Sequence, residues 1–171
     1  MATAEDIIEL LGLEPLPGEG GFYRETYRAA DTLTPKALPR RYGSPRSCST
    51  AIYYLVTPES FSALHRLPTD EIFHHYGGDP VQQLQLHPDG SGEVVVLGMG
   101  LAAGQRPQVL VPAKVWQGAR LLPGAGQGWA LLGTTMAPGF EFEDFEAGSR
   151  RRLAVSYPQF RDLVEALTPA P

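Results

Sequence analysis

The chain of 171 residues contains a single cysteine, Cys48, so no disulfide can form within it. A reducing compartment is therefore the simpler expectation. Basic residues are also scarce, because 14 Lys and Arg stand against 19 Asp and Glu, for a formal net charge of -5. Phosphate backbones are bound by basic surfaces, so we do not expect nucleic acid as a partner.

Long apolar runs are absent as well. No stretch is long enough to cross a bilayer as a helix. The first thirteen residues carry Glu5, Asp6 and Glu9 in place of the basic start of a signal peptide. We therefore expect a cytoplasmic protein with no membrane partner. The sequence also lacks a Walker loop, a dinucleotide-binding glycine pattern and a serine nucleophile elbow.

Turn-forming residues, in contrast, are abundant, with 19 glycines and 16 prolines. Between them, short β-branched, aromatic or alternating segments recur about every 8–12 residues, which is typical of an all-β barrel or sandwich. Helix patterns occur only near the two ends, at residues 3–11 and 159–167. Strands are also expected at residues 140–145 and over part of 149–156. The length predicts one domain, residues 1–171.

Two spaced motifs contain the side chains best suited to binding or catalysis. The first is H-x-L-x3-E-x6-G, formed by His65, Glu71 and Gly78. The second is P-A-K-x2-Q, which runs from Pro112 to Gln117. If the segments lie on neighbouring strands of a small barrel, they place an imidazole, a carboxylate and an amide in one pocket.

These motifs resemble the two motifs of the cupin superfamily, with substitutions. Leu67 stands at the second histidine of the first motif, Lys114 at the glycine of the second, and Gln117 at its last histidine. Longer strings, such as GGFYRETYR from residue 20 and TAIYYL from residue 50, resemble a small cupin-like family of uncharacterised function.

The resemblance implies a double-stranded β-helix, the cupin jelly roll, with short terminal helices and usually a homodimer. It also implies a likeness in shape to epimerases that act on dTDP-4-keto-6-deoxyhexoses. Those enzymes use a histidine base with an acidic partner, and a tyrosine acid. His65 is the candidate base, since an imidazole titrates near neutral pH. Asp144 shares strand parity with residues 140 and 142, which suggests a His65–Asp144 dyad; the alternative is a surface carboxylate.

Further candidates come from the aromatic strands. Arg24 would suit an anionic ligand if it points into the barrel, and would otherwise form a salt bridge or a dimer contact. Tyr53 is a candidate ligand-binding phenol, as are Tyr23 and Tyr54; the alternative for each is packing in the barrel wall.

A metal site is the weaker expectation. Cupin metals typically take three histidines and one glutamate, whereas the donors here would be His65, Glu71, Gln117 and His75, which shares strand parity with Glu71. We expect no cofactor, or at most a weakly held divalent ion. Three functions stay open: a metal-independent epimerase- or isomerase-like enzyme, a non-catalytic module for a small molecule, and a metal-dependent, dioxygenase-like cupin.

Overall fold

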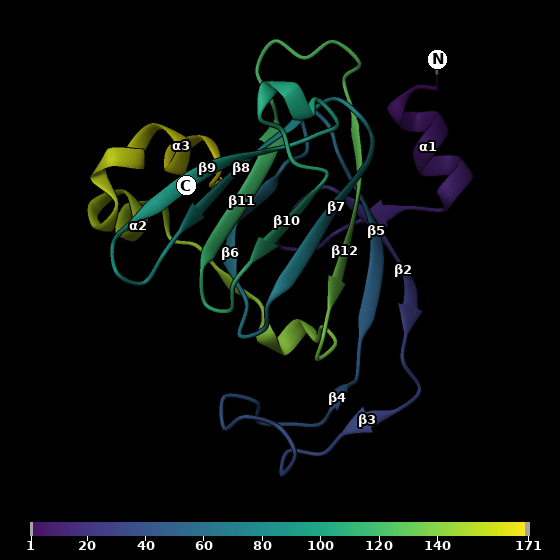
Figure 1. Cartoon of the computed structure of the whole chain (residues 1–171), viewed down its shortest axis with the longest axis vertical. Helices are drawn as coiled ribbons and strands as arrows, with labels where there is room; N and C mark the ends of the chain where they lie inside the picture. The colour runs from purple at the N-terminus through teal and green to yellow at the C-terminus, as the bar shows by residue number, and fades with distance from the viewer. Residues whose placement is uncertain (1, 170–171) are drawn as a thin grey trace.

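The computed structural model describes residues 2–169. Two antiparallel sheets face each other (Figure 1). The first has six strands in the spatial order β1 (Glu14–Pro15), β2 (Phe22–Arg28), β5 (Thr50–Val56), β12 (Ala130–Met136), β7 (Glu71–Gly78) and β10 (Gln108–Val111). The second has five, in the order β13 (Glu146–Ala147), β6 (Ser62–Arg66), β11 (Trp116–Leu121), β8 (Val81–Leu86) and β9 (Gly92–Leu97). A small arm adds the pair β3 (Thr32–Leu33) and β4 (Arg46–Ser47).

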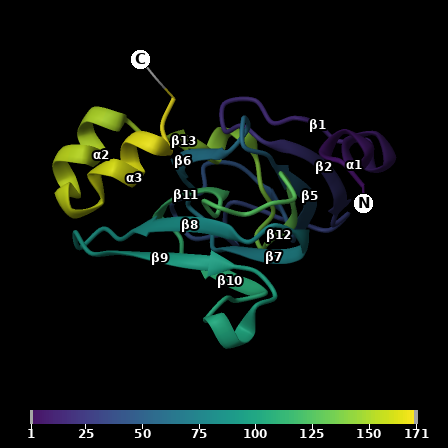
Figure 2. The same cartoon turned by 90° about the horizontal axis from the view of Figure 1, so that it is seen from above.

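The helices lie outside the sheets. They are α1 (Ala4–Leu11), α2 (Arg150–Ser156) and α3 (Arg161–Ala166), with short 3-10 turns η1 (Leu101–Ala103), η2 (Phe142–Asp144) and η3 (Pro158–Phe160). Figure 2 shows α1 and the pair α2 and α3 at opposite sides of the barrel. Ile7 of α1 packs on Leu55 of the six-stranded sheet. The helices α2 and α3 cover the outer face of the five-stranded sheet.

Strand alternation explains how one sheet serves two cores. On β8, Val81 belongs to the core between the sheets, whereas Leu84 and Leu86 pack outward against α2 and α3. Gln83 and Gln85 share the parity of Val81 and are almost fully buried, so the interior carries amides among its hydrocarbon. The barrel is therefore polar in places, which a cavity for a polar molecule requires.

Several local predictions are confirmed. Thr3 caps α1 in a capping box with Asp6, and Gly12 ends it in the left-handed conformation. The expected turn after Gly78 joins β7 to β8, and Gly78 has φ +85°, with Trp129 so close that a Cβ would lie 2.3 Å from its carbonyl oxygen. Only glycine fits there.

Two strand predictions near the C-terminal end are wrong. Residues 140–145 contain the 3-10 turn η2 in place of a strand. Residues 150–156 form α2, which begins at a Ser149 cap and buries Leu153 and Ala154. In both segments the short-range pattern was ambiguous, and packing against the barrel decided it. The predicted fold class, a mostly β jelly roll of two antiparallel sheets with short terminal helices, is confirmed. None of the helices formed by residues 2–169 is long and apolar enough to span a membrane.

Candidate functional site

A cavity of about 290 Å³ opens on the inner face of the six-stranded sheet. Strands β2, β5, β7 and β12 form its wall, and the segments at residues 16–19 and 140–142 close its sides. Its lining is Leu16, Glu19, Tyr23, Glu25, Arg28, Thr50, Ile52, Leu67, Glu71, Thr134, Met136, Phe140, Glu141 and Phe142. Apolar walls with a few carboxylates are typical of small-molecule sites.

The structure brings the residues of the two sequence motifs together. Gln117 on β11 donates from Nε2 to Oε2 of Glu71 on β7 at 2.6 Å, which joins the two sheets across the barrel. His65 on β6 lies opposite Gln117 in the strand register. All three side chains are buried, and of the three only Glu71 lines the cavity.

His65 contacts a carboxylate, but it is Glu19 and not Asp144. Its Nδ1 lies 2.8 Å from the carbonyl oxygen of Ala63, so this nitrogen carries the proton and donates it. Nε2 then faces Glu19, whose Oε2 is 3.7 Å away. The ring also stacks on Phe145, with centroids 5.2 Å apart. These contacts hold the imidazole behind Glu19, at the edge of the cavity.

Glu19 was missed by the sequence analysis because it lies in a glycine-rich loop outside both motifs. Gly20, with φ +96°, lets the loop pass so near β6 that a Cβ would lie 2.4 Å from the carbonyl oxygen of Phe61. Ser62 then donates from Oγ to Oε1 of Glu19 at 2.7 Å. The local signal was the sequence PGEGG, which marks a turn but does not say what the turn approaches.

Burial is the main reason that the pKa of Glu71 is raised above its ordinary value of 4.5, and the negative charge of Glu19 raises it further. His65 and hydrogen bonds from Thr134 and Gln117 act in the opposite direction without cancelling the rise. A carboxyl with a raised pKa keeps its proton to a higher pH, so Glu71 is suited to donate one.

Asp144 has a different role from the one predicted. Its carboxylate accepts two hydrogen bonds from Arg46, from Nε at 2.9 Å and from Nη2 at 2.6 Å. The side chain of Arg46 is only 1% exposed. The dyad prediction failed because strand parity does not apply to a 3-10 turn, and Asp144 belongs to η2. It anchors the arm at β4 to the barrel and makes no contact with His65.

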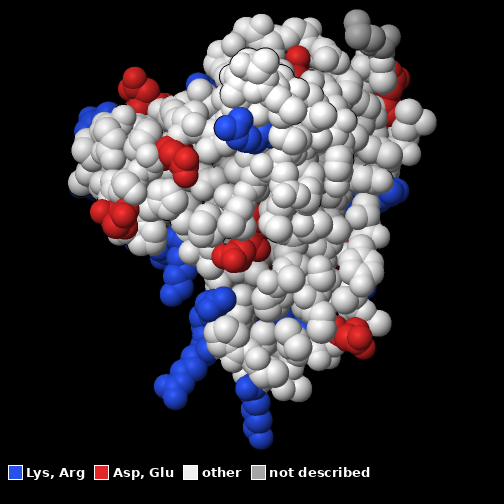
Figure 3. All heavy atoms as spheres, in the orientation of Figure 1, with Lys and Arg blue, Asp and Glu red and all other residues white. Residues whose placement is uncertain are grey.

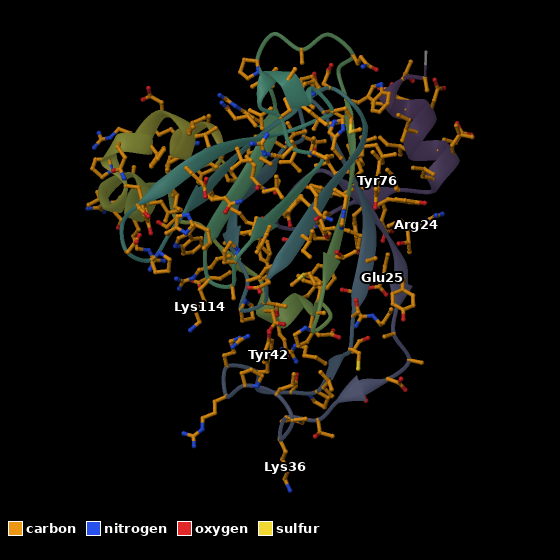
Figure 4. All side chains as sticks on the ribbon, viewed as in Figure 1. Arg24, Glu25, Lys36, Tyr42, Tyr76 and Lys114 are labelled. Atoms are coloured by element: carbon orange, nitrogen blue, oxygen red, sulfur yellow. The ribbon has the colours of Figure 1, made fainter. Side chains whose placement is uncertain are left out.

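Arg24 and Tyr53 also point away from the cavity. They pair across β2 and β5, and the guanidinium lies 5.6 Å from the Tyr53 ring centroid on the outer face of the sheet. Figure 4 labels Arg24 beside its neighbour Glu25 on β2. The alternate residues Tyr23 and Glu25 line the cavity instead. The structure therefore favours the alternative given for Arg24, a side chain outside the barrel, and it places the candidate phenol Tyr23 at the cavity.

His75 is buried as its parity predicted, but it serves another end of the barrel. Its Nε2 lies 3.0 Å from the carbonyl oxygen of Asp79 in the β7–β8 turn. Four residues of extended strand separate it from Glu71, roughly 13 Å. His75 therefore lies apart from the other donors proposed for a metal, and residues 2–169 contain no group of three or more His, Cys, Asp or Glu arranged to hold an ion.

A second, larger hollow of about 640 Å³ lies at the surface between α1 and residues 126–129. Among residues 2–169, the titratable residues that line it are Glu5 and Glu59. It contains no member of either motif, so the barrel cavity is the better candidate for chemistry.

Two facing antiparallel sheets, closed around a cavity lined by several carboxyl groups, define a cupin-type barrel protein. Residues 5–148 match the family described as "Cupin superfamily (DUF985)", and the chain belongs to this family. The resemblance seen in the sequence is confirmed.

Relatives of the chain include the uncharacterised protein YML079W of Saccharomyces cerevisiae, 32% identical over 133 residues. That match covers 74% of this chain and 66% of the yeast protein, so the chain spans slightly less than two thirds of its relative. A hypothetical protein from Leishmania major has a TM-score of 0.88 and 31% identity, covering 99% of this chain and 100% of that one. Protein SO0799 from Shewanella oneidensis has a TM-score of 0.87 and 34% identity, covering all of both chains.

Proposed function

We propose that the barrel cavity binds one small polar molecule and that Glu71 and Glu19 move a proton on it. The observation that carries this proposal is the pair of unequal carboxyls on one cavity wall. Glu71 is buried, with a raised pKa, and Glu19 is less buried and backed by His65. A carboxyl group that burial keeps protonated, placed beside a more exposed carboxyl group, is typical of an acid and base pair.

In this proposal Glu19 takes a proton from a carbon next to a carbonyl group and Glu71 gives one back. His65 is a positioning residue, because it lies behind Glu19 and does not line the cavity. One proton leaves the substrate and one returns, so the reaction is an isomerisation or epimerisation and needs no second reactant. Tyr23, whose pKa is raised by burial and by Glu14, supplies a neutral phenol at the same wall.

Deuterium incorporation tests the proposal. The protein is incubated in D2O with a low-molecular-weight metabolite extract, and mass spectrometry identifies compounds that gain one deuterium. We expect the wild type to label at least one compound. Glu71→Gln should lower that labelling by about a hundredfold or more, because a general acid contributes on this scale.

Asp144→Asn is the informative control. Its contacts are with Arg46, so it should change stability without changing the labelling. Thermal denaturation of each variant shows that it is folded. If Glu71→Gln labels as fast as the wild type, Glu71 is not the acid and the proposal fails.

A non-catalytic binding module is the second candidate. His65, the base predicted from the sequence, is only 2% exposed and does not line the cavity, and binding alone needs no base at that position. Mass spectrometry of molecules released from the purified protein separates the two. A released compound that binds again but gains no deuterium indicates binding alone.

A further inference from the structure

We propose that the cavity selects a small organic cation, an amine with an apolar body, over anionic and neutral molecules of the same shape. This inference rests on the proposed function, because it names the class of molecule that the same cavity takes.

The charges on the cavity wall are the first argument. Four carboxyl groups line it, on Glu19, Glu25, Glu71 and Glu141. Arg28 is the one Lys or Arg among the lining residues of the described chain. A phosphate or carboxylate ligand would therefore approach the carboxylates of Glu19, Glu25 and Glu141, with one guanidinium to offset them, in a partly enclosed space where charges are weakly screened.

Arg28 is not free to receive an anion, because each of its three nitrogens already has a partner. Nε donates to Oε1 of Glu25 at 3.0 Å, and Nη2 donates to Oε2 of Glu25 at 2.9 Å. Nη1 donates to Oε1 of Glu141 at 2.6 Å, and Nη2 also reaches the carbonyl oxygen of Phe140 at 3.0 Å. The guanidinium thus ties β2 to the segment after β12, and it neutralises part of the rim without offering an open fork.

The hydrogen-bonding character of the wall is the second argument. Glu19 and Glu71 present carboxyl oxygens to the cavity, and these oxygens are acceptors. The amide of Gln117 lies behind Glu71 and spends its Nε2 donor on that carboxyl, so it offers no donor to a ligand there. An ammonium group carries donors and no acceptor, so it complements such a set, whereas a carboxylate carries acceptors only.

The rest of the wall suits the body of an amine. Leu16, Ile52, Leu67 and Met136 supply hydrocarbon surface, and Tyr23, Phe140 and Phe142 supply aromatic rings. The rings of Phe140 and Phe142 meet edge to face, with centroids 5.1 Å apart. Aromatic faces attract cations as well as apolar groups, so they add to the preference set by the carboxylates.

Three probes of one shape and different charge test the inference: benzylamine, benzyl alcohol and benzoate. Binding to the full chain is measured by ligand-observed NMR and by calorimetry near neutral pH. We expect benzylamine to bind at least tenfold more tightly than benzyl alcohol, and benzoate to bind more weakly than either. Glu19→Gln should weaken benzylamine about tenfold and leave benzyl alcohol unchanged.

Glu9→Gln is the matched control, because it removes the same charge from the exposed surface of α1. It should leave all three affinities unchanged. Equal or tighter binding of the alcohol or the benzoate overturns the cation preference but leaves a small-molecule site in place. If none of the three probes binds, both the cation preference and the proposed cavity function fail.

Discussion

At the scale of one residue, the surroundings of Glu71 change how readily its carboxyl group ionises. The side chain is 7% exposed and accepts a hydrogen bond from the amide of Gln117 at 2.6 Å. Burial and the charge of Glu19 both disfavour the ionised form. The same residue on the surface would be an ordinary carboxylate.

The raised pKa of Glu71 predicts a pH-dependent stability. The folded protein holds this proton more tightly than the unfolded chain, so the stabilisation is complete below the ordinary pKa of 4.5 and is lost as the pH rises through the folded value. Each unit of pKa difference corresponds to about 1.4 kcal/mol. Glu71→Gln cannot ionise, so we expect it to gain stability relative to wild type between about pH 4.5 and pH 8.

Urea denaturation at several pH values measures this difference. Glu9→Gln, on the exposed surface, should show the wild-type profile. Parallel profiles for wild type and Glu71→Gln would contradict the raised pKa.

At the scale of elements, the turn before β11 retains a glycine-like conformation without a glycine. Lys114 has φ +69°, in the left-handed region, and it is the one non-glycine residue with positive φ between residues 2 and 169. The cupin motif places glycine at this position. A left-handed backbone conformation strains a residue with a Cβ, so the lysine is strained there.

We expect Lys114→Gly to stabilise the protein, because removing Cβ relieves the left-handed strain. The gain is about 0.5–1 kcal/mol, since strain of about 1–2 kcal/mol is offset by the greater entropy of glycine in the unfolded chain. Lys36→Gly is the matched control, in an exposed turn without positive φ; Figure 4 labels both lysines. It should be neutral or destabilising in the same urea titration. A loss of stability in Lys114→Gly, equal to that of Lys36→Gly, would show that the turn is unstrained.

At the scale of the whole molecule, the two sheets are covered unequally. Helices α2 and α3 pack on the five-stranded sheet, whereas α1 covers only part of the six-stranded one. The uncovered part carries Tyr76 at 53% and Leu110 at 51% exposure. Figure 3 shows few charged side chains over β7, β10 and β12, with Lys and Arg gathered at the lower end of the view. Apolar surface of this kind is typical of an interface.

The expected homodimer stays a prediction, and light scattering on the purified chain tests it. We expect twice the 18.6 kDa mass of one chain. Tyr76→Asp should shift the mass toward one chain, because it places a charge on the uncovered sheet. Val155→Asp, on α2 at 72% exposure, should not. A wild-type mass of one chain would contradict the dimer prediction. If both variants dissociate to the same extent, the interface does not lie on the uncovered sheet.

What the sequence determined by itself was local or periodic. Thr3 and Asp6 define a helix start, Gly78 defines a turn, and alternating apolar residues define the strands, because each depends on neighbours a few positions away. The motif spacing was also sufficient to bring Glu71 and Gln117 together, since both lie on regular strands whose faces follow from the cupin resemblance.

Only the tertiary structure decided the rest. Glu19 reaches His65 through a glycine loop, Asp144 turns to Arg46 through a 3-10 turn, and Arg24 faces outward because the parity of β2 is set by the packing of Tyr23 inside. In each case the side chain's direction depends on an irregular segment or on which sheet face is buried. Sequence periodicity predicts neither the irregular segments nor the buried face, because it describes the order of residues along a segment and not the residues that the segment packs against.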